Sequence, residues 1–295
     1  MKLIIIALII LLIITLIIKY TNKEGYENNE PKIAFITAIY SNYEASCKPF
    51  IQQTIPTDFI CFTDNENIIN NGWIVDKTPY HYNNKSPVDN DTYINSLSNN
   101  THTFNIAKYY KQNFYNIPIL NKYDVIVWID GSIEITNNNT SNWIMENIYK
   151  HKIIGWEHEH RNGILKNEVD SSTDSRYTSN FWNNQSQPIQ DISGQYNTYI
   201  NNGYDENYFK NINKERANLG VWITCFVAFL KNDDTVKTFL NEWYLQTLKY
   251  STQDQIGFSY VCQKQNIIPY TLPDNEIKGF PHEKTDFYIK QTHGK

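Results

Sequence analysis

The sequence predicts an α/β fold with a mostly parallel central sheet, in one domain that follows an N-terminal membrane anchor. Val125–Ile129 is a run of β-branched and aromatic residues, which is typical of a strand buried on both faces. The run stops at Asp130, and Gly131 follows it. Strand and helix patterns alternate on both sides of this stretch, which is the order expected for a parallel sheet.

Short apolar runs that end in polar residues predict the first strands of the sheet. Thr37 lies near the end of the first run and Asp64 near the end of the second. Because the carboxyl ends of parallel strands share one edge of a sheet, we expect Thr37, Asp64 and Asp130 to converge there. The three runs that precede the strand of Asp130 span residues 32–40, 58–65 and 72–76.

Apolar residues at helical spacing predict four helices. The first of them leads directly into the strand that ends at Asp130, which gives β-α-β order. Residues 78–103 are polar and predict an irregular surface loop, and residues 170–203 predict a mobile lid over the site. The helices are expected at residues 104–117, 142–151, 234–250 and 251–262, and two further strands at residues 152–156 and 219–230.

An apolar segment begins the chain. In Leu3–Ile18 only Thr15 is polar, and lysines lie on both sides of the segment. Its length falls between a signal-peptide core and the ~20 residues that span a bilayer comfortably. Because no small-residue cleavage site follows, we predict an uncleaved signal anchor over residues 1–20, a short stem over residues 21–30 and a folded domain over residues 31–295; a cleaved signal peptide is the alternative.

A short anchor suits a thin membrane of the secretory pathway. The anchor therefore predicts a single-pass protein of type II orientation that contacts the lipid bilayer through its N-terminal segment. Its domain would then lie in the lumen of the secretory pathway or outside the cytoplasm.

The charge of the chain argues against a nucleic-acid-binding protein, and the spacing of its cysteines argues against a zinc site. The formal net charge is -5 at pH 7, with no basic cluster beyond the flank of the apolar segment. Since binding a phosphate backbone requires clustered Lys and Arg, nucleic acid is not an expected partner. The four cysteines are widely spaced without a CxxC pair, which excludes a cysteine zinc site of the usual spacing.

The candidate site residues also have plain structural interpretations. Asp130 could cap a turn after its strand, and Lys108 and Lys111 could form one solvated face of a helix. Asp254 falls in the first turn of a helix, where the helix dipole favours a carboxylate. Against these stands the position of Asp130, because a carboxylate at the end of a buried strand, beside a glycine, lies where open α/β sheets bind ligands.

Two histidines follow the strand predicted at residues 152–156. On an extended segment, His158 and His160 would place their imidazoles on the same face, as a metal or phosphate site requires. A charged strand edge is the alternative. With Asp130 these histidines would also suit a metal-dependent hydrolase, provided that further ligands lie close in space.

Four blocks of residues, taken together and in this order, resemble the glycosyltransferase-like family of the plant TOD/MUCI type, which has bacterial and viral relatives. The resemblance covers residues 31–268. His158 and Arg161 resemble the His-Pro-x-Arg block of that family, with Glu159 in place of the proline, and Phe114 and Tyr115 stand where the family has Pro-His. The blocks are Thr57–Asp64, Ala107–Lys111, Trp128–Ile133 and Asp254–Val261.

The resemblance implies a GT-A-like, Rossmann-type fold that moves a sugar from a nucleotide-sugar donor to a glycan or glycoprotein acceptor. Asp130 then stands where such enzymes place their Asp-x-Asp carboxylates, which hold Mn²⁺ or Mg²⁺ against the diphosphate. Here Ser132 replaces the second carboxylate. A further ligand, such as His158, His282 or His293, would then complete the metal site.

The same resemblance implies roles for the remaining residues. Asp254 would face the acceptor, as the catalytic base if the enzyme inverts. The contacts to the nucleotide-sugar are expected from Thr37, Ala38 and Asp64 to the nucleoside, from Lys108, Lys111 and Arg161 to the diphosphate, and from Gln255. A nucleotide-sugar-binding module without catalytic activity is a further alternative, because the motif carries a single carboxylate.

Overall fold

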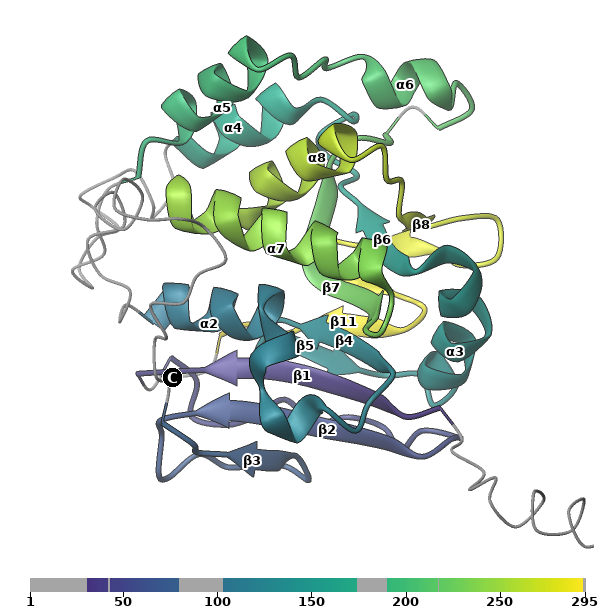
Figure 1. Cartoon of the computed structure of the whole chain (residues 1–295). Helices are drawn as coiled ribbons and strands as arrows, with labels where there is room; N and C mark the ends of the chain where they lie inside the picture. The colour runs from purple at the N-terminus through teal and green to yellow at the C-terminus, as the bar shows by residue number, and fades with distance from the viewer. Residues whose placement is uncertain (1–30, 42, 80–102, 174–189, 217, 294–295) are drawn as a thin grey trace, which may run out of the picture. The chain divides into compact units, whose positions relative to one another are not determined.

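The computed structural model describes residues 31–41, 43–79, 103–173, 190–216 and 218–293 (Figure 1). The predicted anchor, the stem and most of the polar segment at residues 78–103 lie outside this range. Residues Ile33–Lys295 form one compact unit. Among the described residues, no helix is both long and apolar enough to cross a membrane.

Strands and helices alternate through most of this unit, as the sequence predicts. Every predicted strand and helix is present, with bounds shifted by a few residues. The elements in chain order are β1 (Ile33–Ile39), β2 (Thr57–Thr63), β3 (Ile74–Asp76), α2 (Thr103–Gln112), η1 (Phe114–Asn116), η2 (Pro118–Leu120), β4 (Val125–Ile129), β5 (Ile133–Ile135), α3 (Thr140–His151), β6 (Ile153–Glu157), α4 (Leu165–Thr173), α5 (Ile192–Asn201), α6 (Tyr208–Ile212), β7 (Trp222–Leu230), α7 (Asp234–Lys249), α8 (Asp254–Lys264), β8 (Tyr270–Leu272), β9 (Gly279–Phe280), β10 (Lys284–Thr285) and β11 (Tyr288–Lys290).

A seven-stranded sheet in the order β3-β2-β1-β4-β7-β6-β8 forms the centre of the unit. All its strands run in one direction except β7, which is antiparallel to both β4 and β6. The predicted mostly parallel, Rossmann-like sheet is therefore confirmed. The chain moves outward from β1 to β3 and then returns to β4 on the other side of β1, so the strand order reverses between β1 and β4. Such a reversal opens a crevice at the carboxyl ends of the strands.

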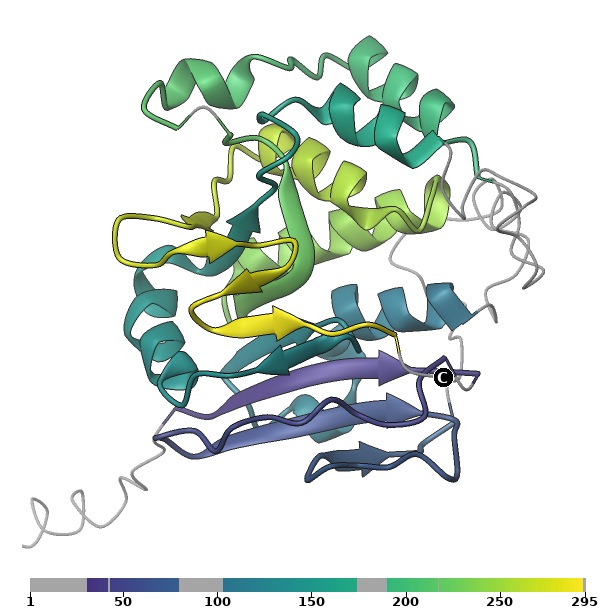
Figure 2. The ribbon, with the colours of Figure 1, turned by 180° about the vertical axis from the view of Figure 1, so that it is seen from behind.

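Each face of the sheet is covered by a different layer. Because side chains alternate along a strand, Ala34 and Ile36 of β1 pack on one face and Ile33 and Phe35 on the other. Helices α2, α7 and α8 cover the first face (Figure 1). Helix α3 and the C-terminal strands cover the second, as the view from behind shows (Figure 2). All five residues of β4 are buried between the two layers.

The C-terminal strands form a second, antiparallel sheet in the order β5-β11-β10-β9. No sequence pattern predicts this sheet, the strand β8 or the helices α4, α5 and α6. Of the lid predicted over residues 170–203, residues 174–189 lie outside the described range and residues 192–201 form the helix α5, so the lid stays a prediction. Asp191 caps that helix by accepting a hydrogen bond from the backbone of Gly194 at 2.7 Å.

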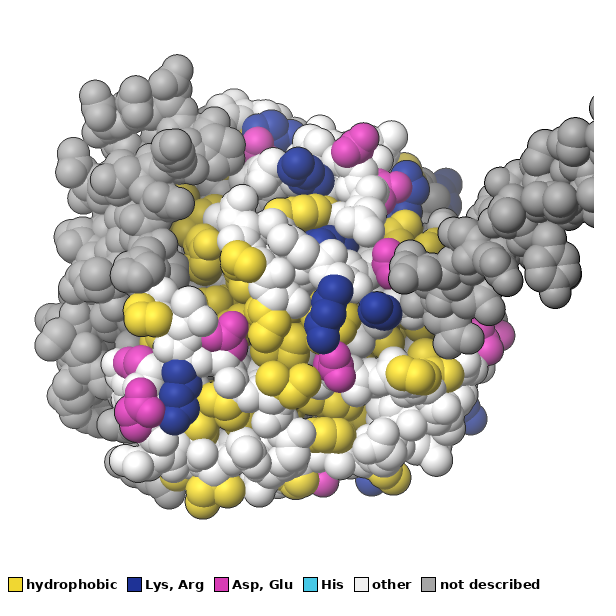
Figure 3. All heavy atoms as spheres, turned by 60° about the horizontal axis from the view of Figure 1, so that its bottom comes forward, with side chains coloured by type: hydrophobic (Ala, Val, Ile, Leu, Met, Phe, Trp, Pro, Cys, Tyr) yellow, Lys and Arg dark blue, Asp and Glu magenta, His cyan; other side chains and the backbone are white. Residues whose placement is uncertain are grey.

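The face at the bottom of Figure 1 shows how the described surface charges are distributed. Lysine and carboxylate side chains lie beside one another there, among hydrophobic and uncharged groups (Figure 3). Among the described residues, Lys122 and Asp58 form an exposed pair, with the ammonium 3.3 Å from the carboxylate. Exposed pairs of this kind contribute little to stability.

Gly220 provides a test of the backbone that positions the start of β7. Its φ is +137°, and an added Cβ would lie 2.4 Å from the carbonyl oxygen of Gly163. We expect Gly220→Ala to lower the free energy of unfolding by about 3 kcal/mol, since it adds a backbone clash to an unfavourable φ. Gly203, with a φ of +88° and no atom within 4 Å of an added Cβ, is the matched control. Gly203→Ala should lower the free energy of unfolding, measured in urea, by about 1 kcal/mol. Equal losses for the two variants would show that the contact with Gly163 does not constrain Gly220.

Candidate functional site

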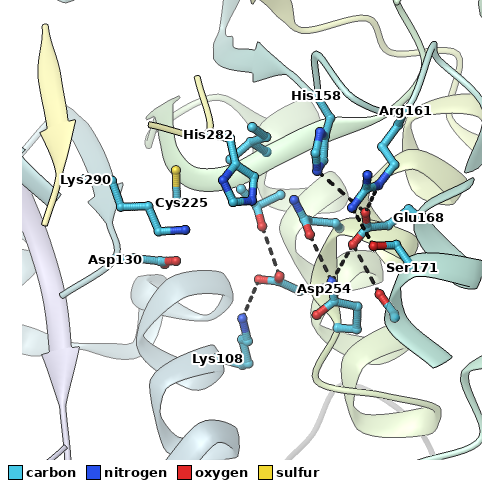
Figure 4. A pocket seen from close by; sticks show the side chains of 15 residues that line it. Lys108, Asp130, His158, Arg161, Glu168, Ser171, Cys225, Asp254, His282 and Lys290 are labelled. Atoms are coloured by element: carbon cyan, nitrogen blue, oxygen red, sulfur yellow. Dashed lines mark hydrogen bonds and ion pairs between the residues drawn. The ribbon is translucent and has the colours of Figure 1, made fainter. Parts of the chain in front are cut away.

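A pocket of about 330 Å³ lies at the edge of the sheet where its parallel strands end. Asp130 follows β4 and His158 follows β6, so the carboxyl ends of both strands bring a side chain to the pocket. The antiparallel strand β7 begins at the same edge and contributes Thr224. Figure 4 shows the other side chains that enter the pocket from the helices, from the turn after β6 and from the small sheet, which include Lys108, Arg161, Glu168, Asp254, His282 and Lys290.

The structure brings most of the predicted site residues to this pocket. Lys111 lies beside the pocket and contacts two of its carboxylates. Thr37 and Ser132 are buried, Ala38 is half-buried and Asp64 is exposed; these four are not among the residues that line the pocket. The predicted residues that do line it are Lys108, Asp130, His158, Arg161, Asp254 and Gln255.

Asp130 is held at the end of β4 by both its backbone and its side chain. Its backbone N–H donates to the carbonyl of Cys225 on β7 at 2.8 Å. The indole Nε1 of Trp128 donates to Oδ1 at 2.8 Å, and the ammonium of Lys111 lies 3.9 Å from the same oxygen. The side chain is still 44% exposed. Asp130 is thus a fixed carboxylate that remains accessible from the pocket.

Asp254 forms the centre of a buried charge network. Its Oδ2 lies 2.6 Å from the ammonium of Lys111 and 2.9 Å from that of Lys108, and the hydroxyl of Thr224 donates to Oδ1 at 2.9 Å. Burial alone would raise the pKa of Asp254, but the two lysines outweigh it and hold the pKa at about 2.

The buried end of this network is Lys111, whose side chain is only 1% exposed. Burial lowers its pKa, and Asp254 acts in the opposite direction. Its ammonium also lies 5.6 Å from the ring centres of Trp128 and Trp243, within range of a cation–π interaction. A carboxylate that two ammonium groups stabilise is a weak proton acceptor. The predicted role of Asp254 as catalytic base stays a prediction, and its surroundings favour a role as counterion.

Glu168 of α4 organises the opposite wall of the pocket. The guanidinium of Arg161 donates from Nε to Oε2 of Glu168 at 2.5 Å, and the amide of Gln253 donates to Oε1 at 2.6 Å. His158 Nε2 lies 3.7 Å from the same carboxylate. Burial is the main cause that lowers the pKa of His158 to about 3, and the positive charge of Arg161 adds to it. His158 is therefore neutral at physiological pH.

We tested whether the predicted ligands fit a divalent cation. Asp130 and His158 both line the pocket, but the side chain of Ser132 is buried outside it. In the part of the chain that the structure describes, no three His, Cys, Asp or Glu side chains are arranged to hold a metal ion. The buried Ser132 does not fit as the second ligand, the cation stays a prediction, and we derive no catalytic step through it.

The two histidines do not lie on an extended segment, but their rings are close together, with centroids 6.1 Å apart. The strand β6 ends at Glu157, and His158 to Arg161 form a turn rather than an extended segment. As a result, the side chain of His158 is 2% exposed and that of His160 is 61% exposed. His160 does not line the pocket, although its ring centroid lies 6.1 Å from that of His282, which does. A site that uses both His158 and His160 stays a prediction.

Several residues of the pocket were not predicted as site residues. Thr224 had a signal in the sequence, because it is a hydroxyl within the apolar run that forms β7. Glu168 lies on the helix α4, which no sequence pattern predicts. His282 is predicted only as a possible further metal ligand, and no sequence pattern marks Lys290 as a site residue. Both reach the pocket through the small sheet, whose strands are two or three residues long.

Comparison with known proteins finds structural neighbours, among them two glycosyltransferases, and no sequence match. No protein family model and no curated protein matches the sequence, so the resemblance to the TOD/MUCI type stays a prediction. The bifunctional glycosyltransferase WbbM, in its apo form, aligns at 10% identity with a TM-score of 0.41, over 79% of this chain and 37% of that protein. The mannosyltransferase Ktr4p from S. cerevisiae aligns at 10% identity with a TM-score of 0.35, over 79% of this chain and 62% of that protein.

Removing the charge of Asp254 should destabilise the protein. Asp254→Asn leaves the buried Lys111 with only the more distant carboxylate of Asp130, at 3.9 Å, and we expect the free energy of unfolding to fall by about 3 kcal/mol. Asp64→Asn changes an exposed carboxylate at the same edge of the sheet and should cost less than about 1 kcal/mol. Urea unfolding of both variants measures the difference. A loss for Asp254→Asn as small as that for the control would show that the network does not stabilise the fold.

Protonation of His158 predicts a loss of stability in mild acid. The unfolded chain takes up a proton near the ordinary pKa of 6.5, whereas the folded chain does so only near about 3, so stability falls as the pH decreases through this range. Between pH 7 and 5 this one group should account for about 2 kcal/mol. Unfolding of His158→Gln at several pH values should therefore show a shallower decrease than the wild type. Identical slopes would rule out this contribution.

Proposed function

We propose that the chain is a glycosyltransferase that moves a sugar from a nucleotide-sugar donor to a glycan or glycoprotein acceptor. One observation carries this proposal: Asp130 ends the strand at which the strand order reverses, and it shares its pocket with the basic side chains of Lys108, Arg161 and Lys290. Crevices at such a reversal bind nucleotides in open α/β sheets. The basic groups suit the diphosphate end of a sugar diphosphate, and the carboxylate suits the hydroxyl groups of its sugar end.

The chemistry of transfer places different demands on these groups. The acceptor hydroxyl attacks the anomeric carbon, the bond between that carbon and the diphosphate oxygen breaks, and the diphosphate leaves with the electron pair. Fixed positive charge near the leaving oxygen stabilises this step, because negative charge develops on that oxygen as the bond breaks. Lys108 and Arg161 are fixed by Asp254 and Glu168, so they need little reorganisation when the donor binds.

The nucleoside and the cation are less closely defined. Thr37 and Ala38 of β1 and Asp64 after β2 belong to the same edge of the sheet as Asp130, which supports a nucleoside site beside the pocket. Gln255 lines the pocket itself. The Mn²⁺ or Mg²⁺ ion stays a prediction. The anchor, the type II orientation and the lumenal location also stay part of the proposal, since they rest on residues 1–20.

The proposal predicts donor hydrolysis that depends on Asp130. Full-length protein in detergent, incubated with UDP- and GDP-sugars, should release the nucleoside diphosphate, and Asp130→Asn should slow this release by about 100-fold or more. Asp234→Asn, which changes an exposed carboxylate at the start of α7, is the matched control and should keep the wild-type rate.

Other outcomes separate the alternatives. Binding of nucleotide-sugars without release or transfer in any condition would indicate a binding module that lacks catalytic activity. Failure to bind any nucleotide would contradict the proposal, and hydrolysis of a substrate without a nucleotide would then favour the hydrolase.

A further inference from the structure

The C-terminal strand β11 places Lys290 beside the Asp130-Gly-Ser turn. Lys290 pairs in register with Ile133 of β5, and the next residue, Gln291, donates its backbone N–H to the carbonyl of Ser132 at 2.8 Å. Ser132 occupies the position at which an Asp-x-Asp motif has its second carboxylate. The strand that passes beside this position is β11, and it carries Lys290.

Lys290 differs from the other basic groups at the pocket in having no partner carboxylate. Lys108 and Lys111 are paired with Asp254, and Arg161 with Glu168. For Lys290, no ion pair within 4.0 Å is found among the residues that the structure describes. It is exposed and lines the pocket, and Figure 4 shows its ammonium on the same side of the pocket as the Asp130 carboxylate.

The balance of charge at the pocket favours an anion. The lining residues carry three basic side chains and three carboxylates, and the buried Lys111 beside them adds a fourth positive charge. The imidazoles of His158 and His282, which also line the pocket, add no negative charge. The electrostatic effect of Lys290 reaches across the pocket, because it contributes to the lowered pKa of both His158 and His282. An anion that enters the pocket therefore meets Lys290 as an available partner.

We propose that Lys290 binds the diphosphate of the donor beside Asp130 and supplies there the positive charge that a divalent cation supplies in an Asp-x-Asp site. This inference rests on the proposed function and extends it, since it makes nucleotide binding independent of a metal ion. A lysine ammonium is a compact point charge with three donors, and hydrogen bonds from it to phosphate oxygens are among the strong ones. Lys108, fixed by Asp254, is the second contact to the same group.

The test is nucleotide binding by the full-length protein in detergent, measured by calorimetry with UDP and GDP. In EDTA the wild type should bind at least one of them with a Kd close to that in Mn²⁺. Lys290→Ala should weaken this binding by about tenfold or more, whereas Lys290→Arg should retain most of it. Lys284→Ala, which removes an exposed lysine from the neighbouring strand β10, is the matched control and should leave the Kd unchanged.

Three results would overturn the inference. Binding by the wild type that appears in Mn²⁺ and disappears in EDTA would leave the proposed function in place and show that a cation is required. A Kd for Lys290→Ala equal to that of the wild type would show that another group holds the diphosphate. Failure of the wild type to bind either nucleotide in any condition would overturn the proposed function together with this inference. Circular dichroism of each variant confirms that a lost affinity does not reflect unfolding.

Discussion

Lys111 of α2 and Asp254 of α8 meet as buried charges at the start of β7, with Nζ 2.6 Å from Oδ2. Removing two charges from water costs several kcal/mol for each ion, so such a pair persists only where further groups satisfy it. Thr224 donates to one carboxylate oxygen, and Lys108 pairs with the other. Because the network joins two helices and a strand, it fixes the wall of the pocket and the side chain of Lys108 together.

The antiparallel direction of β7 gives the pocket its composition. In an all-parallel sheet, the neighbours of β4 would bring only their carboxyl ends to this edge. Here β7 begins at the edge, so Thr224 lies between the ends of β4 and β6. It contacts Asp254 directly, and the ammonium of Lys111 donates to its hydroxyl at 3.0 Å. The reversed strand thus links the carboxylate of α8 to the centre of the sheet.

The sequence predicted those parts of the fold that local patterns determine. Strands β4 and β7 and helix α7 were found because long apolar runs and helical stripes report burial directly. The small sheet was missed because its strands are too short to show a period, and α5 because its segment is rich in polar residues. At the site, Asp130 and Lys108 were located by their positions on predicted elements. The pairing of Arg161 with Glu168, and the approach of Lys290 to Asp130, depend on tertiary contacts that no local pattern records.

The single carboxylate of Asp130 and the position of Lys290 are physically linked. With two carboxylates in the motif, a divalent cation would be needed to offset their repulsion of the diphosphate. With Asp130 alone, less negative charge has to be offset, and Lys111 at 3.9 Å already offsets part of it while also serving Asp254. A single further ammonium is then sufficient to make the site attractive to an anion. The strand that carries it is bound to the turn at Ser132 itself, so this ammonium lies beside the position where an Asp-x-Asp motif would carry its second carboxylate.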